Sequence, residues 1–303
     1  MLKKIKISKD FEDVRLDKWL KKRFRLTQSY IEKNLRKGLI KVNNKKIKAS
    51  QKVLSGDIID IKNFSEKNFS NIRIKKTSKN ISGEFINKFK SSIIYENKDF
   101  IVINKWNDIA TQGGSKINIS INEIIKFISD EYNLVHRLDK DTSGLLIISK
   151  NYKSSKIFGK MFKDQQIEKY YLAICQGIPK NLNSNLKLKI IDKKNPTKSS
   201  YSFTKYKVLI KKNKISIILF SPKTGKTHQL RIVSKRLGCP IVGDKKYNIN
   251  INNTKEKLKL NASRLKFNFK NKEYIFTSNL PIHFSNYLKN NQIKFNIKSF
   301  QDY

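Results

Sequence analysis

Residues 135–150 read VHRLDKDTSGLLIISK, a charged turn that runs directly into an apolar strand. Within the turn, Arg137 and Lys140 flank Asp139. A carboxyl group between two cations is expected to stay ionised, because nearby positive charge favours its charged form. The run LLIIS after the turn residues predicts a β-strand.

An ionised Asp139 suits a nucleophile or a general base better than a proton donor. The alternative is structural, because DKDTSG is also a plausible turn in which Asp139 could cap the backbone or join an ion pair. The residues alone leave both roles open.

The composition indicates a folded protein with a polyanionic partner. The chain has 303 residues, 38% hydrophobic, which is enough for one sizeable core and a small accessory domain. Its net charge of +42 favours binding to phosphates. Codon bias is an alternative source of part of this charge, since only nine of the 66 basic residues are arginines. The same bias makes each arginine more informative, because arginine should persist where a planar, bidentate donor is needed.

Other classes of site are not favoured. Cys175 and Cys239 give neither a disulfide framework nor a CxxC metal motif. His136, His228 and His283 are too scattered for a zinc site, so no metal and no cofactor are expected. The N-terminus lacks a signal peptide, and no stretch reaches the roughly 18 apolar residues of a membrane span. A cytoplasmic protein is expected.

Residues 12–62 are expected to form a compact unit. RLDKWLKKRF predicts a helix with Leu16, Trp19, Leu20 and Phe24 at helical spacing. SYIEKNLRKG predicts a second helix that ends at Gly38, and Asn43 and Asn44 predict the turn of a hairpin. This stretch resembles the S-four-like RNA-binding domain, named after a ribosomal protein. The alternative for its cations is a solvated face. The cations expected to contact RNA are Arg23, Arg25, Lys33, Arg36, Lys37, Lys41, Lys45 and Lys46.

Residues 63–90 predict a linker, and residues 91–303 a second domain of class α+β. Ser120 and Glu123 form a capping box before INEIIKFISDEY, a predicted helix in which Ile121, Ile124, Ile125 and Ile128 share one face. EKYYLAICQG, KYKVLI, KISIILF and EYIFTS predict strands joined by short polar turns. The expected architecture is a mixed, largely antiparallel sheet with inserted helices. GKT at 225–227 suggests a phosphate loop, but Phe220 stands where that motif requires glycine.

HRLDKDTSG, EKYYLAICQG, THQLRIVSKRLGCPIVGDKKY and LKLNASRLKF, in this order, resemble the motifs of pseudouridine synthases that join an S-four-like domain to a catalytic domain. The resemblance implies that Asp139 is the catalytic residue. It implies that Arg137 fills the gap left by a flipped-out uridine and that Tyr171 lies against the flipped base. It also implies that Arg231 pairs with the aspartate. The chain departs from the family at Trp106 and at Asn261, where proline and histidine are usual.

The resemblance implies an isomerase of RNA that needs no cofactor. IATQGGS and the short spacing between domains resemble members that act on large-subunit ribosomal RNA. Another region of the same RNA and a tRNA are the alternatives, and an inactive RNA-binding or ribosome-assembly protein is a further one. A monomer is expected, with RNA as its partner and neither membrane nor nucleotide cofactor involved.

Overall fold

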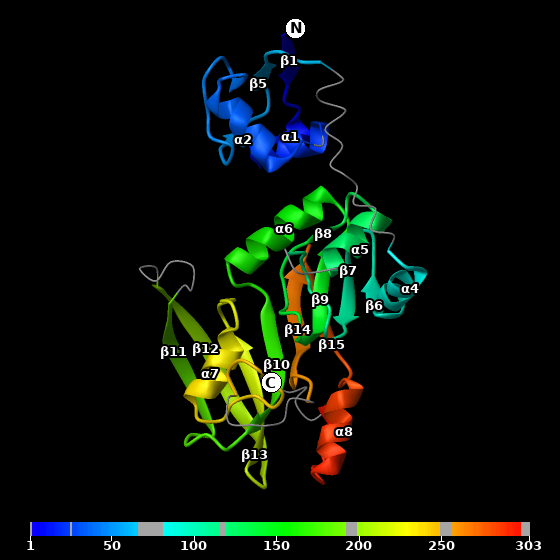
Figure 1. Ribbon diagram of the computed structural model, residues 1–303, viewed down its shortest axis with the longest axis vertical. Coiled ribbons are helices and arrows are strands. Elements are labelled where there is room, and N and C mark those ends of the chain that lie inside the picture. The colour runs from blue at the N-terminus through cyan, green and yellow to red at the C-terminus, as the bar shows by residue number, and fades with distance from the viewer. Residues whose placement is uncertain are drawn as a thin grey trace. The chain divides into compact units, whose positions relative to one another are not determined.

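The computed structural model describes residues 2–24, 26–65, 81–114, 119–191, 199–248 and 256–297. The chain divides into two compact units, Met1–Asn80 and Ile81–Tyr303. Figure 1 colours the elements of both units from blue to red along the chain.

The N-terminal unit packs two helices with short strands. Leu16, Trp19 and Leu20 are buried, which confirms the apolar face predicted for the first helix. Strands β1, β5 and β3 form an antiparallel sheet, and β2 pairs with β4. The elements are β1 (Lys3–Lys6), η1 (Lys9–Phe11), β2 (Val14–Arg15), α1 (Leu16–Phe24), α2 (Gln28–Arg36), β3 (Ile40–Val42), β4 (Lys52–Val53) and β5 (Ile58–Ile61).

Two details of this unit differ from the expectation. A domain that begins at residue 12 omits β1, which pairs with β5 along its whole length. Asn43 and Asn44 adopt the positive φ angles predicted for a tight turn, 47° and 63°. However, the residues after this turn form only an isolated bridge between Val42 and Lys45. The reason is that Asn43 Oδ1 accepts a hydrogen bond from Ile58 N at 2.8 Å, which ties the turn to β5 instead.

The second unit is built on one large mixed sheet, as the sequence predicts. Among the described residues, ten strands join in it, eight of them in the order β11-β12-β13-β10-β14-β9-β7-β6, with β15 paired to β14 and β8 to β9. Its pairs are antiparallel except for the short contact between β14 and β9. The strands are β6 (Ile93–Glu96), β7 (Phe100–Lys105), β8 (Asn133–Leu134), β9 (Ser143–Ser149), β10 (Glu168–Gln176), β11 (Asn183–Ile191), β12 (Ser199–Lys212), β13 (Ile215–Pro222), β14 (Leu260–Phe269) and β15 (Lys272–Thr277).

Helices cover both faces of this sheet (Figure 1). The helices are α4 (Gly83–Ser91), α5 (Ile121–Ile128), α6 (Tyr152–Lys163), α7 (Gln229–Arg236) and α8 (Ile282–Asn290). Side chains of α4 and α5 pack with Leu146 and Ile148 of β9, whereas those of α6 pack with Leu145 and Ile147 of the same strand. All seven residues of β9 are therefore buried. In the described ranges, no helix is both long and apolar enough to cross a membrane.

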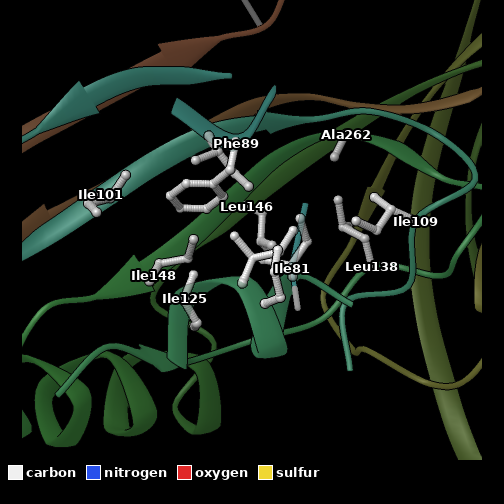
Figure 2. Packing of buried hydrophobic residues seen from close by; sticks show 12 residues of the cluster. Ile81, Phe89, Ile101, Ile109, Ile125, Leu138, Leu146, Ile148 and Ala262 are labelled. Carbon is white, nitrogen blue, oxygen red and sulfur yellow. The ribbon is translucent and has the colours of Figure 1, made fainter. Parts of the chain in front are cut away.

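The linker expected over residues 63–90 is wrong at its C-terminal end. Residues 83–91 form α4, and Phe89 is 1% exposed. Figure 2 shows Ile81 and Phe89 packed with Leu146 in the core of the second unit. Ile81, Phe85 and Phe89 recur every four residues, the spacing of one helix face, in a segment otherwise rich in polar residues. Residues 66–80 of the expected linker lie outside the described residues.

The capping box at the start of α5 is confirmed, but the helix is shorter than expected. Ser120 Oγ accepts from Glu123 N at 3.4 Å and donates to the Glu123 carboxylate at 2.9 Å. Ile124 and Ile125 are buried, as predicted from their spacing. Ile128, expected on the same face, is 39% exposed because the helix ends there.

Candidate active site

The turn that carries Asp139 is anchored through its buried neighbour Leu138. Thr111 Oγ1 donates to Leu138 O at 2.7 Å and accepts from Leu138 N at 3.1 Å. Thr142 N donates to Asp139 O at 3.1 Å and closes the turn. With Leu138 fixed in the core, Arg137 is exposed and the Asp139 side chain is 23% exposed.

Gly144 sets the close approach of β9 to β14 directly after this turn. Its φ is +107°, and a Cβ atom at this position would lie 2.3 Å from Ala262 O. Beside it, Ser143 Oγ donates to Asn261 Oδ1 at 2.8 Å, and Asn261 Nδ2 donates to Ser278 Oγ at 2.8 Å. Asn261, which departs from the family pattern, is thus a fully buried hydrogen-bonding residue between strands.

Lys105, at the end of β7, holds the other side of the turn. Its side chain is fully buried, and Nζ donates to the carbonyl oxygens of Trp106, Ile109 and Lys140 at 3.0, 3.0 and 3.2 Å. Burial lowers the pKa of Lys105 to about 7, against the opposing negative charge of nearby aspartates that include Asp139. This contact could not be predicted from the sequence, since a single lysine in so basic a chain carries little signal.

All four residues that the resemblance implies line one cavity of about 500 Å³. Arg137 and Asp139 come from the turn before β9, Tyr171 from β10 and Arg231 from α7. The loop at 222–228, between β13 and α7, lines the cavity as well. Residues that are distant in the sequence therefore meet around a volume typical of small-ligand sites.

Arg231 forms a bidentate pair, but with Asp244. Its Nε donates to Asp244 Oδ2 at 2.8 Å and its Nη2 to Oδ1 at 2.7 Å. Asp244 Oδ1 also accepts from the backbone N–H groups of Lys246 and Tyr247 at 2.9 and 3.1 Å. The bidentate partner implied by the resemblance, Asp139, is therefore replaced by Asp244. The physical reason is burial, since Asp244 is 2% exposed and a carboxylate in the interior requires full hydrogen bonding.

The charges around this pair are stabilised mutually. Burial acts to raise the pKa of Asp244, but the Arg231 guanidinium and the backbone donors outweigh it and lower that pKa. Burial acts to lower the pKa of Arg231, and the carboxylates of Asp244, Asp139 and Asp141 together raise it. Asp139 thus stabilises the charge of Arg231 from a distance, whereas Asp244 is bonded to the guanidinium directly.

His228 is a member of the site that the sequence analysis missed. It has a left-handed φ of +55° at the start of α7, with its Nε2 3.9 Å from Asp139 Oδ2 and its Nδ1 3.1 Å from the Tyr247 hydroxyl. Burial lowers the pKa of His228 against the opposing negative charge of Asp139, and the positive charges of Arg231 and Lys246 act in the same direction as burial. The only signal in the sequence was its place in THQLR, because the histidines were weighed solely as metal ligands.

Tyr171 presents a neutral ring to the cavity. It lies where β10 shifts register against β14, between Tyr170 and Tyr171. Burial and, after it, the negative charge of Asp139 raise the pKa of Tyr171. The hydroxyl therefore stays protonated, and the ring is available as an apolar surface.

The other predicted RNA contacts lie on the N-terminal unit. Side chains of Arg23, Lys33, Arg36, Lys37, Lys45 and Lys46 are exposed and that of Lys41 is half-buried. Arg25 lies outside the described residues. Their contact with RNA stays a prediction. Within the described ranges, no three His, Cys, Asp or Glu side chains form a group that could hold a metal ion.

Comparison with known proteins defines the class. Residues 99–235 match the family model of RNA pseudouridylate synthases, and residues 14–59 match the S4 domain. With the relatives described next, these matches show that the chain belongs to the RNA pseudouridylate synthase family and carries an N-terminal S4 domain. It is accordingly an isomerase.

Several relatives of this chain have the name ribosomal large subunit pseudouridine synthase C. The protein of that name from Rickettsia bellii is 40% identical, over 77% of this chain and 82% of its own length. The one from Buchnera aphidicola subsp. Baizongia pistaciae is 33% identical over 94% of this chain and 96% of its own length. The structure of human RNA Pseudouridylate Synthase Domain Containing 4 has a TM-score of 0.62 at 22% identity, covers 70% of this chain and 97% of its own, and supports the fold alone.

Proposed function

We propose that this protein converts uridine to pseudouridine in large-subunit ribosomal RNA, with Asp139 acting on the sugar of a flipped-out nucleotide. The observation that carries the proposal is the meeting of Asp139, Arg137 and Tyr171 around one cavity. The names of the relatives support the ribosomal target.

The reaction conserves all atoms. The bond between ribose C1′ and uracil N1 breaks, the base rotates, and C1′ bonds to C5, while C5 loses a proton and N1 gains one. The carboxylate of Asp139 either attacks C1′ or removes the proton of the adjacent C2′, and both routes require its ionised form.

The neighbours of Asp139 suit this role. Burial raises the pKa of Tyr247, so its hydroxyl can donate to His228 Nδ1. With the Tyr247 hydroxyl as donor, His228 Nε2 carries the hydrogen that faces Asp139 Oδ2, 3.9 Å away. Hydrogen bonds of catalytic groups are often this long before substrate binds and tighten in its presence. A neutral donor orients the carboxylate without neutralising it.

Base flipping has a cost of a few kcal/mol, which contacts with the protein must offset. Tyr171 offers its ring to the extruded base inside the cavity. Arg137, exposed at the same cavity, can enter the gap that the base leaves in the RNA. Both contacts are sequence-tolerant, so target choice must come from the RNA fold and from other surfaces.

We propose further that the chain acts as a monomer in the cytoplasm. All the proposed catalytic and substrate-binding residues come from one unit of one chain. Cys175 and Cys239 are buried free thiols, in keeping with a reducing compartment. Sedimentation of the purified protein, alone and with RNA, tests the monomer.

Mapping pseudouridines in cellular ribosomal RNA with and without this protein tests the target and the activity together. Loss of pseudouridine at specific positions of large-subunit ribosomal RNA in its absence supports the proposal. Loss confined to tRNA would show that the substrate is a tRNA. Release of tritium from RNA containing 5-tritiated uridine tests the chemistry alone. A protein that binds this RNA and releases no tritium would be the inactive assembly factor considered above.

A further inference from the structure

The hairpin of β11 and β12 has one buried and one exposed face. In β12, Ser202, Thr204 and Tyr206 are buried, whereas the residues between them are exposed. The exposed cross-strand pairs are Lys187 with Phe203 and Lys189 with Tyr201. We name this face the β11–β12 platform, made of Lys187, Lys189, Tyr201, Phe203, Lys205 and Lys207.

Two aromatic rings lie open on the platform. Tyr201 is 53% exposed and Phe203 43%, and they stand two residues apart on the same side of one strand. Lys187 Nζ lies 4.5 Å from the centre of the Tyr201 ring and 5.7 Å from that of Phe203. An exposed pair of rings leaves apolar area in water, which is unfavourable unless a partner covers it.

The charge of the platform identifies the partner as an anion. The described residues of β11 and β12 include no Asp or Glu, and four lysines surround the two rings. A second copy of the chain would bring the same positive charge, so self-association through this face is opposed. An RNA strand supplies phosphates for the lysines and base faces for the rings.

The rings select unpaired RNA. Bases in a duplex are stacked on each other, so their faces are closed to an aromatic side chain, whereas unpaired bases can stack on it. Alternating aromatic and basic side chains are the combination by which proteins bind single strands with little sequence preference.

The platform is joined directly to the wall of the active-site cavity. Phe203 N donates to Thr224 Oγ1 at 3.0 Å, and Phe203 O accepts from Lys223 N at 3.0 Å and from Gln229 Nε2 at 3.2 Å. Thr224, Lys223 and Gln229 all line the cavity. The loop that lines the cavity is therefore bonded to the strand that carries both rings.

From these observations we infer that the β11–β12 platform binds a single-stranded segment flanking the target uridine, with unpaired bases stacked on Tyr201 and Phe203. The inference rests on the proposed function, because it takes the RNA substrate of the same cavity as its ligand. It adds a binding site at the outer end of the sheet, where β11 is the edge strand (Figure 1).

The test measures binding of a fluorescent oligouridylate to the full-length Tyr201→Leu/Phe203→Leu variant. Leucine keeps apolar area but removes the ring, so stacking is separated from general hydrophobic contact. We expect binding at least about tenfold weaker than wild type, since each stacked base contributes about fivefold or more. Binding of a duplex of equal length should stay unchanged. Phe127→Leu, which removes a ring that is 58% exposed on α5, is the matched control and should bind as wild type.

A second variant reports stacking directly. Tyr201→Trp should bind oligouridylate as wild type or tighter, and its added fluorescence should be quenched by the RNA. Wild-type affinity of the double leucine variant, or no quenching of the added tryptophan, would overturn the inference. Concentration-dependent dimerisation that the leucine variant loses, with RNA binding intact, would also overturn it by assigning the face to a second copy.

These outcomes do not depend on turnover. Failure of the proposed function would instead appear as absence of tritium release by the wild-type protein, whatever the platform binds.

Discussion

At the residue scale, Asp139→Asn is expected to abolish isomerisation and leave RNA binding intact. The amide keeps the size of the side chain but can neither attack the sugar nor take its proton, and Asp139 contributes no attraction for phosphate. Single-turnover tritium release and filter binding measure the two properties. Asp141→Asn is the matched control, because it removes a carboxylate from the same turn that does not line the cavity. Substantial turnover by Asp139→Asn would refute the assignment.

Asp244 is expected to be a structural anchor of the site. Asp244→Asn breaks a buried bidentate pair and leaves Arg231 as an uncompensated buried cation, with an expected loss of about 3–5 kcal/mol in the free energy of unfolding. Asp108→Asn, which breaks an exposed pair with Lys257, should cost at most about 1 kcal/mol. Urea denaturation of the three proteins gives the comparison. Equal stability of the two variants would contradict the anchoring role.

The contribution of Asp244 should also depend on pH. Because its pKa is lowered in the folded state, its stabilisation is complete above the unfolded-state value of about 3.9 and is lost as the pH falls through the folded value. The gap in stability between wild type and Asp244→Asn should therefore be constant near neutrality and shrink under acid conditions. A gap that grows on acidification would contradict this assignment of charge.

The sequence motifs predicted which residues meet around the cavity better than they predicted the hydrogen-bond partners of those residues. Asp139, Tyr171, Arg137 and Arg231 belong to distinctive motifs, and all four line one cavity. The partner of Arg231 was predicted wrongly, because a motif does not specify which of two carboxylates folding brings to the guanidinium. The loop after α7 decides this by returning Asp244 to the helix through its own turn hydrogen bonds.

At the element scale, the close approach of the start of β9 to β14 depends on Gly144. Gly144→Ala is expected to cost several kcal/mol of stability, because its φ of +107° is strained for alanine and the new Cβ atom would lie 2.3 Å from Ala262 O. Gly159→Ala is the control, since it lies in α6 with no atom within 4 Å of the new Cβ. That change should stabilise by about 0.5–1 kcal/mol. Thermal unfolding should give a lower melting temperature than wild type for Gly144→Ala and a higher one for Gly159→Ala.

Elements with strong periodicity were predictable, and those defined by tertiary pairing were not. The apolar spacing of α1 and the capping box of α5 are local features, so both helices could be found in the sequence. Helix α4 was mistaken for linker because Ile81 and Phe89 are buried only through their packing against β9, which is distant in the sequence. The parallel contact of β14 with β9 joins segments more than a hundred residues apart, which no local pattern encodes.

At the scale of the whole molecule, the second unit is expected to fold without the first, and the first unit is expected to add affinity for ribosomal RNA. Each unit has its own buried core, and the second begins at Ile81. Deleting residues 1–80 should therefore leave the second unit folded, with its tritium release on short single-stranded RNA retained. Circular dichroism and thermal unfolding of the truncated chain check the first point.

The same deletion should weaken binding to structured ribosomal RNA and make it less sensitive to salt. Each lysine or arginine that contacts phosphate contributes about 0.7–0.9 to the slope of log affinity against log salt. Six of the cations predicted to contact RNA are exposed on the first unit, including Arg36 and Lys45, so losing even half of them as contacts would change the slope measurably. Binding isotherms across a salt series, for full-length and truncated protein, measure this change. An unchanged slope would mean that the cations of the first unit are solvated and do not touch RNA, and that the affinity for ribosomal RNA comes from the second unit alone.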